Sequence, residues 1–125
     1  MSYVYYNPNP LGLSVGDCTI RAISRALNLM WEQTYNALAR KGFEMCDMPS
    51  ANRVWSTFLK QQGFKKYQMP DLCPDCYTVR DFCYNSPYGT FILGTGEHVV
   101  CVIDGNYYDS WDSGNEIPLY YFKRS

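Results

Sequence analysis

The Asp104-Gly105 pair is the feature that most restricts how this chain can fold. It separates two runs rich in β-branched and aromatic residues, 97–103 and 106–111, and Asp-Gly is a strong signal for a two-residue hairpin turn. With that turn, Ile103 faces Asn106 and the two runs pair as antiparallel strands. The sequence therefore predicts a β-hairpin in the last third of the chain.

The first half of the chain carries helical patterns instead. We predict helices over 18–28, over 31–41 with Gly42 as the C′ residue, and over 51–62 with Ser50 as the N-cap. The remaining predicted elements are strands at 3–6, 64–68, 90–93 and 118–122, and a short helix opened by a capping box at Thr78. Helices first and strands last predict an α+β fold, with N-terminal helices packed on a C-terminal antiparallel β-sheet in a single domain of residues 1–125.

Composition excludes several classes of function. The 125 residues carry a net charge of −1 and are 46% hydrophobic, so a nucleic-acid partner is not expected. The sequence contains neither a signal-peptide pattern nor an apolar run of membrane-spanning length, so we expect a cytoplasmic protein with no membrane partner. Six cysteines in such a chain are typical of free thiols, metal ligands or a nucleophile rather than a disulfide framework.

Cys18 is the candidate nucleophile. It lies in the first turn of the first predicted helix, directly after Asp17, a candidate N-cap. Unpaired N–H groups and the helix macrodipole stabilise a thiolate at this position. His98 is the only histidine in the chain, so it is the only imidazole that could serve as the base. The alternative is that Cys18 is a small core residue and His98 a core histidine.

The hairpin register selects the third member of the site. A two-residue turn at Asp104-Gly105 places His98 opposite Trp111, with Asp109 as its diagonal neighbour on the same face. A three-residue loop would instead place Asp112 opposite His98. We predict Asp109 as the carboxylate that orients the imidazole, with Asp112 as the alternative.

This order of residues resembles the papain-like cysteine peptidases. Asp109-Ser110-Trp111 is similar to the Asn-Ser-Trp segment of papain, in which the amide orients the histidine and the Trp shields that hydrogen bond. Asp17-Cys18 resembles the Asp-Cys pair of the double-glycine peptidases attached to bacteriocin exporters. The short chain and its Asn-Pro-rich start are similar to small papain-like proteins of bacteriophages and gut bacteria. The resemblance implies a papain-like fold, a protein or peptide substrate, no cofactor, and a shielding role for Trp111.

The sequence departs from the papain-like pattern at the oxyanion hole. That family usually places a Gln six residues before the nucleophile, and this chain has Gly12 there. Asn7 and Asn9 are the candidate replacements, with the backbone N–H of Cys18 as the second donor.

The sequence thus predicts a cysteine hydrolase, either a peptidase or an isopeptidase, and leaves amidase and acyl-transfer chemistry open. A second hypothesis is a non-catalytic interaction protein on the same scaffold, for example a phage inhibitor of a host factor. A third is a small zinc-stabilised binding module, because Cys73-Pro74-Asp75-Cys76 and Cys83 have a zinc-knuckle pattern that Cys46 could complete. We predict no metal. The substrate, the cleavage site and the oligomeric state remain open.

Overall fold

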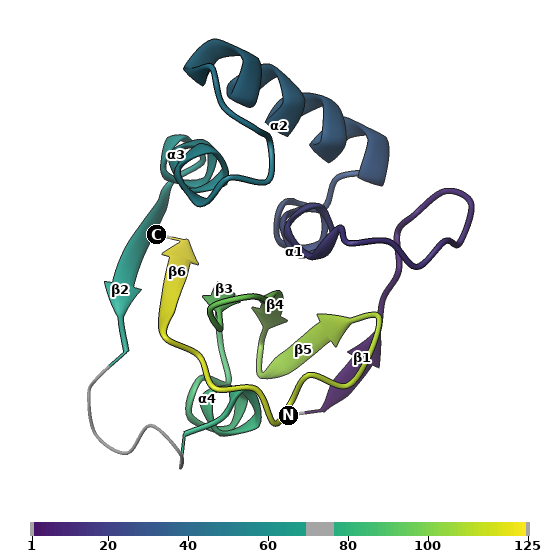
Figure 1. Cartoon of the computed structure of the whole chain (residues 1–125). Coiled ribbons are helices and arrows are strands. Elements are labelled where there is room, and N and C mark those ends of the chain that lie inside the picture. The colour runs from purple at the N-terminus through teal and green to yellow at the C-terminus, as the bar shows by residue number, and fades with distance from the viewer. Residues whose placement is uncertain (1, 70–76, 125) are drawn as a thin grey trace.

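The computed structural model describes residues 2–69 and 77–124, which form a mixed α+β fold (Figure 1). The described helices are α1 (Cys18–Leu27), α2 (Trp31–Met45), α3 (Asn52–Gln61) and α4 (Val79–Asn85). The described strands are β1 (Tyr3–Tyr5), β2 (Phe64–Gln68), β3 (Thr90–Gly94), β4 (Val99–Ile103), β5 (Asn106–Asp109) and β6 (Tyr120–Arg124). None of the described helices combines the length and the apolar character needed to cross a bilayer.

The strands form one sheet in the order β1-β5-β4-β3-β6-β2. The α+β prediction is confirmed. The prediction of an antiparallel, C-terminal sheet is wrong in direction at the β1 edge, and both edge strands lie outside the C-terminal part of the chain. At one edge β1 runs parallel to β5, and at the other β2 pairs antiparallel with β6. Both edge strands come from outside the C-terminal third, because the chain enters the sheet once before the three leading helices and once after them.

The central hairpin has the predicted register. Ile103 pairs with Asn106, and both turn residues have positive φ, 49° at Asp104 and 80° at Gly105. This is the type I′ geometry that matches the twist of the flanking strands. Both strands are shorter than predicted. β4 begins at Val99, so His98 directly precedes it, and β5 ends at Asp109.

Two hydrophobic clusters cover opposite faces of the sheet, because side chains alternate along each strand. In β3 and β4, Ile92 and Cys101 belong to the cluster under α1, α2 and α3. Their neighbours Phe91 and Val100 belong to the cluster that contains Phe82 of α4. Figure 1 shows α1 to α3 on one side of the sheet and α4 on the other. The layer of α1 against β4 is the one that positions the candidate site.

The sequence predicted that α2 ends at Gly42, and this prediction is wrong. The helix continues to Met45, and Cys46 adopts the left-handed conformation at the C-cap with φ of 55°. Gly42 is instead buried where the returning loop crosses the helix, and a Cβ there would lie 2.7 Å from the Asp47 carbonyl oxygen. The N-cap of α3 is Ala51 rather than the predicted Ser50, and no side chain caps it.

Gly42→Ala is expected to lower the free energy of unfolding by about 1–3 kcal/mol, because the new methyl group must displace backbone rather than a flexible side chain. Urea denaturation followed by circular dichroism measures the change. Gly16→Ala is the matched control, since a Cβ at Gly16 meets nothing within 4 Å. Equal stability of the two variants would contradict the packing role of Gly42.

Candidate active site

Asp17 does not cap α1 with its side chain, although it occupies the N-cap position. Its carboxylate instead accepts hydrogen bonds from Arg21 Nη1 at 2.7 Å and Trp31 Nε1 at 2.8 Å. The predicted side-chain cap is therefore wrong. The first N–H groups of a helix have no intrahelical acceptor. The backbone N–H groups in the first turn of α1, which begins at Cys18, therefore donate no hydrogen bond to a capping side chain.

His98 and Asp109 are joined by a hydrogen bond of 2.5 Å between Nε2 and Oδ2. Burial of the Asp109 carboxyl favours its protonated form, but hydrogen bonds from His98 and Ser113 and the charge of Arg21 outweigh burial and lower its pKa. Asp109 is thus a carboxylate, which can only accept, so Nε2 of His98 is the donor. Nδ1 is left as the ring nitrogen available to Cys18.

Asp109 is fully buried and every part of its carboxylate is engaged. Oδ1 lies 3.0 Å from Arg21 Nη2 and accepts from the Ser110 backbone N–H at 2.8 Å. Oδ2 accepts from Ser113 Oγ at 2.6 Å as well as from the imidazole. This network fixes the carboxylate, and through it the plane of the His98 ring.

The Cys18 thiol is hydrogen-bonded to His98 and to the backbone of Val99. Burial of the thiol opposes ionisation, but these two hydrogen bonds and the charge of His98 outweigh it and lower the pKa of Cys18. Burial of the imidazole likewise opposes protonation, yet its hydrogen bonds to Asp109 and Cys18 raise the pKa of His98 to about 9. Each shift favours a thiolate–imidazolium pair at neutral pH.

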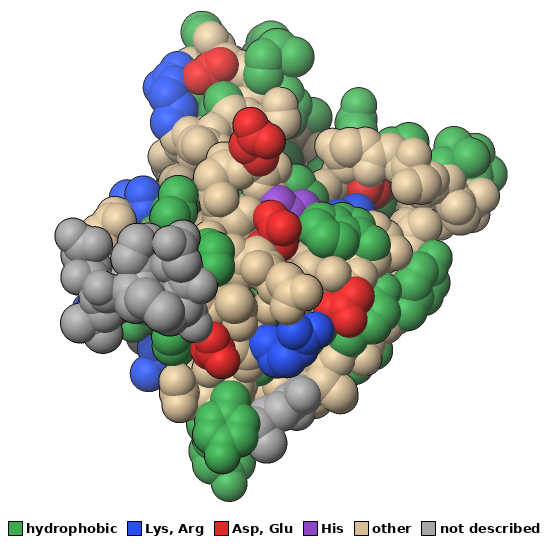
Figure 2. Space-filling view, turned by 60° about the horizontal axis from the view of Figure 1, so that its bottom comes forward, with side chains coloured by type: hydrophobic (Ala, Val, Ile, Leu, Met, Phe, Trp, Pro, Cys, Tyr) green, Lys and Arg blue, Asp and Glu red, His purple; other side chains and the backbone are tan. Residues whose placement is uncertain are grey.

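Trp111 lies against the imidazole, with ring centroids 4.8 Å apart and the rings tilted by 45°. It covers one side of His98 while its own outer surface stays 46% exposed. The side chain of His98 is 12% exposed, and Figure 2 shows it (purple) reaching the surface beside acidic side chains (red). The imidazole is therefore largely covered but still reaches the surface.

Asp112, the alternative orienting acid, does not reach His98. Its carboxylate accepts hydrogen bonds from the Tyr107 hydroxyl, from the Gly114 backbone N–H and from Arg80. This cluster, in which Asp112 and Arg80 are exposed and Tyr107 is buried, is separate from the network of Asp109. The two-residue turn decides the outcome, because it brings Asp109 rather than Asp112 into register with His98.

Asn7 and Asn9, the two oxyanion candidates, both hold the loop before α1 together through side-chain hydrogen bonds. Asn7 Nδ2 donates to the Leu13 carbonyl, and its Oδ1 accepts from the Asn9 backbone N–H. Asn9 Oδ1 accepts from the backbone N–H groups of Leu11 and Leu13. Both amides fold the loop that precedes α1, so the prediction that one of them serves Cys18 has no support in the hydrogen bonds of this loop.

Sequence reasoning missed several groups that hold Asp109. Arg21 binds the carboxylate of Asp109 as well as that of Asp17. Arg21 and Asp109 are 88 positions apart in the chain. The backbone carbonyl of Asp109 accepts from the Tyr3 hydroxyl and from the Tyr6 N–H. The helical pattern gave no signal for the contact of Arg21 with Asp109, because Arg21 stands among its polar positions and is buried only by the tertiary structure.

The zinc alternative falls mainly on residues that the structure does not describe, since Cys73 and Cys76 lie outside the described ranges. Cys83 is buried among Val79 and Phe82 in the cluster around α4. Burial raises the pKa of the Cys83 thiol to about 11. Within the described residues, no group of three or more His, Cys, Asp or Glu side chains could hold a metal ion.

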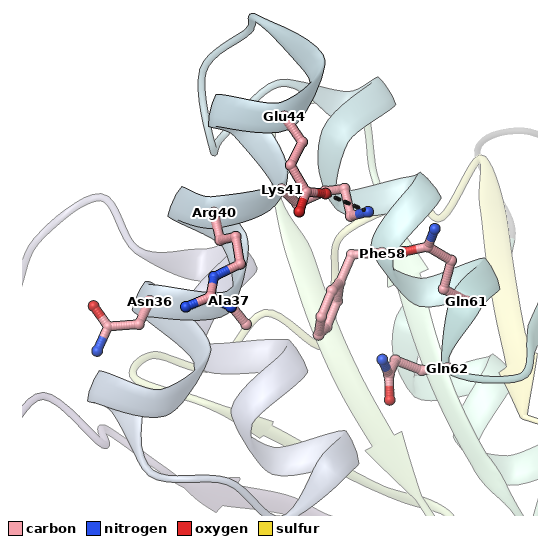
Figure 3. Close-up of a pocket in the computed structure, with 8 residues that line it drawn as sticks. All are labelled: Asn36, Ala37, Arg40, Lys41, Glu44, Phe58, Gln61 and Gln62. Carbon is pink, nitrogen blue, oxygen red and sulfur yellow. Dashed lines mark hydrogen bonds and ion pairs between the residues drawn. The ribbon is translucent and has the colours of Figure 1, made fainter.

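Two pockets differ in their relation to the site. One of about 170 Å³ lies at the N-terminus of α1 and is lined by Asp17 and Thr19, on either side of the nucleophile, and by Tyr35 of α2. The other, of about 390 Å³, lies between α2 and α3 (Figure 3) and contains the Lys41–Glu44 ion pair. The first is lined by residues next to Cys18 in the chain, but Cys18 itself lines neither pocket.

Comparisons with protein-family models, curated proteins and solved structures give no match. The function must therefore be argued from the geometry around Cys18.

Proposed function

We propose that this protein is a cysteine hydrolase of papain-like type that cleaves an amide or isopeptide bond in a protein or peptide. The observation that carries the proposal is the continuous hydrogen-bonded chain from Cys18 through His98 to Asp109. Its members come from α1, from the residue before β4 and from the end of β5. A nucleophile, a base and a group that orients the base are the parts that thiol hydrolysis requires.

In the proposed reaction, Nδ1 of His98 holds the proton of the Cys18 thiol. The thiolate attacks the carbonyl carbon, a C–S bond forms, and the carbonyl electron pair moves to oxygen. His98 then gives its proton to the leaving amine as the C–N bond breaks. Water attacks the resulting thioester and gives one proton to His98. The C–S bond then breaks, which releases the carboxylic acid and restores the Cys18 thiolate.

Selective alkylation of Cys18 is the first test. We expect iodoacetamide at pH 6 to label Cys18 before Cys46, as read by peptide mass spectrometry, because thiolate content controls the rate. Cys46 is the matched control within the same chain, since it is exposed whereas Cys18 is half-buried. Accessibility alone would give the reverse order, and labelling of Cys46 first would remove the basis of the hydrolase proposal.

A non-catalytic interaction protein is the second candidate. The loop before α1 favours it, because Leu11, Leu13 and Val15 are 79%, 52% and 46% exposed. Exposed apolar side chains in one loop are typical of a surface that binds another protein. An unreactive Cys18 in the alkylation experiment would favour this candidate over the hydrolase.

A further inference from the structure

The proposed hydrolase has one oxyanion donor in the expected place, and the second donor remains to be identified. The backbone N–H of Cys18 lies at the start of α1, where no side chain caps the helix. Asn7 and Asn9 are bound within their own loop. Acyl transfer needs at least one further donor aimed at the developing charge. A second donor must come from a hydroxyl or amide group near Cys18.

Tyr120 of β6 is such a group. Tyr120 pairs with Gly94 of β3, and Gly94 pairs on its other side with Val99 of β4. A Cβ at Gly94 would lie 2.4 Å from the Tyr120 hydroxyl oxygen. The hydroxyl thus lies over Gly94, one strand away from Val99, whose backbone binds the Cys18 thiol.

Cys18 and Tyr120 also lie on the same face of the sheet. Both pack as partly buried residues against the core cluster beneath α1, α2 and α3. The Tyr120 ring is held by Trp55, with ring centroids 6.4 Å apart, and by Lys66, whose Nζ is 4.5 Å from the ring centroid. The side chain is therefore fixed by packing while its hydroxyl remains near the nucleophile.

The Tyr120 hydroxyl makes no hydrogen bond to any other described residue, which leaves it able to donate to a ligand. Burial of the phenol and the nearby charge of Cys18 both raise the pKa of Tyr120. The hydroxyl accordingly keeps its proton when Cys18 is a thiolate. A protonated, unoccupied hydroxyl on a fixed ring is a preorganised donor.

We propose that the Tyr120 hydroxyl is the second oxyanion donor, acting with the backbone N–H of Cys18. This assignment rests on the proposed hydrolase function. When the thiolate attacks a carbonyl carbon, the C–S bond forms and the π electron pair moves to oxygen. Tyr120 donates a hydrogen bond to that oxygen, and the pair returns as the leaving group departs with its own bonding electrons. Gly94 is required because any side chain there would occupy the position of the hydroxyl.

Two reactions of Cys18 distinguish this role from packing. p-Nitrophenyl acetate acylates the thiolate through a tetrahedral oxyanion and releases p-nitrophenolate. Iodoacetamide alkylates it by direct displacement at carbon, without an oxyanion. Tyr120→Phe keeps the ring and removes only the donor, so we expect acylation of Cys18 to slow about 100-fold and alkylation to change less than about 2-fold. Peptide mass spectrometry assigns both products to Cys18.

Tyr121→Phe is the matched control, since Tyr121 is the next residue of β6 and packs on the opposite face of the sheet. It should leave both rates unchanged. If Tyr120→Phe leaves acylation unchanged, or slows acylation and alkylation equally, the donor role of Tyr120 is wrong. If Cys18 of the unmodified protein reacts with neither reagent ahead of Cys46, the hydrolase proposal itself fails, whatever Tyr120 does.

Discussion

Replacing His98 by alanine is expected to slow alkylation of Cys18 at pH 6 by about 100-fold. An unperturbed thiol with a pKa of about 8.5 is only about 0.3% ionised at that pH, and the greater intrinsic nucleophilicity of such a thiolate offsets part of the loss. His98→Ala removes both the hydrogen bond and the charge that lower the pKa of Cys18. The second-order rate constant for iodoacetamide measures the effect.

Hydrolysis should suffer more than alkylation, because the leaving amine also loses its proton donor. We expect His98→Ala to lower turnover of a peptide substrate by about 1,000-fold. Glu97→Ala is the matched control, since Glu97 is the exposed neighbour in the same loop and should change neither rate. Alkylation of His98→Ala at the unmodified rate would show that α1 alone activates Cys18.

The dependence on pH follows from the two shifted groups. Cys18 ionises below the ordinary range of a thiol, and His98 keeps its proton until the pH approaches its pKa of about 9. Turnover needs the thiolate and the imidazolium together, so it should rise as the pH passes the lowered pKa of Cys18 and fall as the pH passes about 9. Alkylation needs only the thiolate and should not fall on the alkaline side.

Features encoded by neighbouring residues could be predicted from the sequence. The Asp104-Gly105 turn fixes the hairpin register, and that register alone selects Asp109 over Asp112. The capping box of Thr78 and Asp81 is also as predicted, because both of its hydrogen bonds join residues three positions apart. Such signals are reliable because they depend on backbone geometry within a few residues.

Contacts between distant segments could not be predicted in this way. No pattern in the neighbouring sequence predicts that residues 3–5 pair in parallel with β5, or that Arg21 binds Asp109. Asp17 illustrates the limit: its position predicts an N-cap, but the tertiary contact with Trp31 redirects the carboxylate away from the helix. Tyr120 is a similar case, since only the order of strands β6, β3 and β4 brings its hydroxyl toward Cys18.

Asp109→Asn is expected to lower the free energy of unfolding at pH 7 by about 3 kcal/mol, the effect of leaving a buried charge without its partner. Asp109 is fully buried, and its removal leaves Arg21 and His98 without the carboxylate they share. The amide has nearly the same volume, so no cavity forms. Asp112→Asn is the matched control and should cost much less than Asp109→Asn, because Asp112 is exposed. Urea denaturation measures both.

The pH dependence of stability separates the ionic role of Asp109 from its packing. His98 has a pKa of about 9 in the folded protein against 6.5 for the free side chain, so its contribution is complete below 6.5 and is lost as the pH rises to about 9. Asp109 is shifted below 3.8, so its contribution is present above 3.8 and is lost as the pH falls further. Because each shift depends on the other group, Asp109→Asn should flatten the alkaline slope as well as the acidic one. An Asp109→Asn variant that keeps the full loss of stability between pH 6.5 and 9 would mean that Cys18, rather than Asp109, holds the proton on His98.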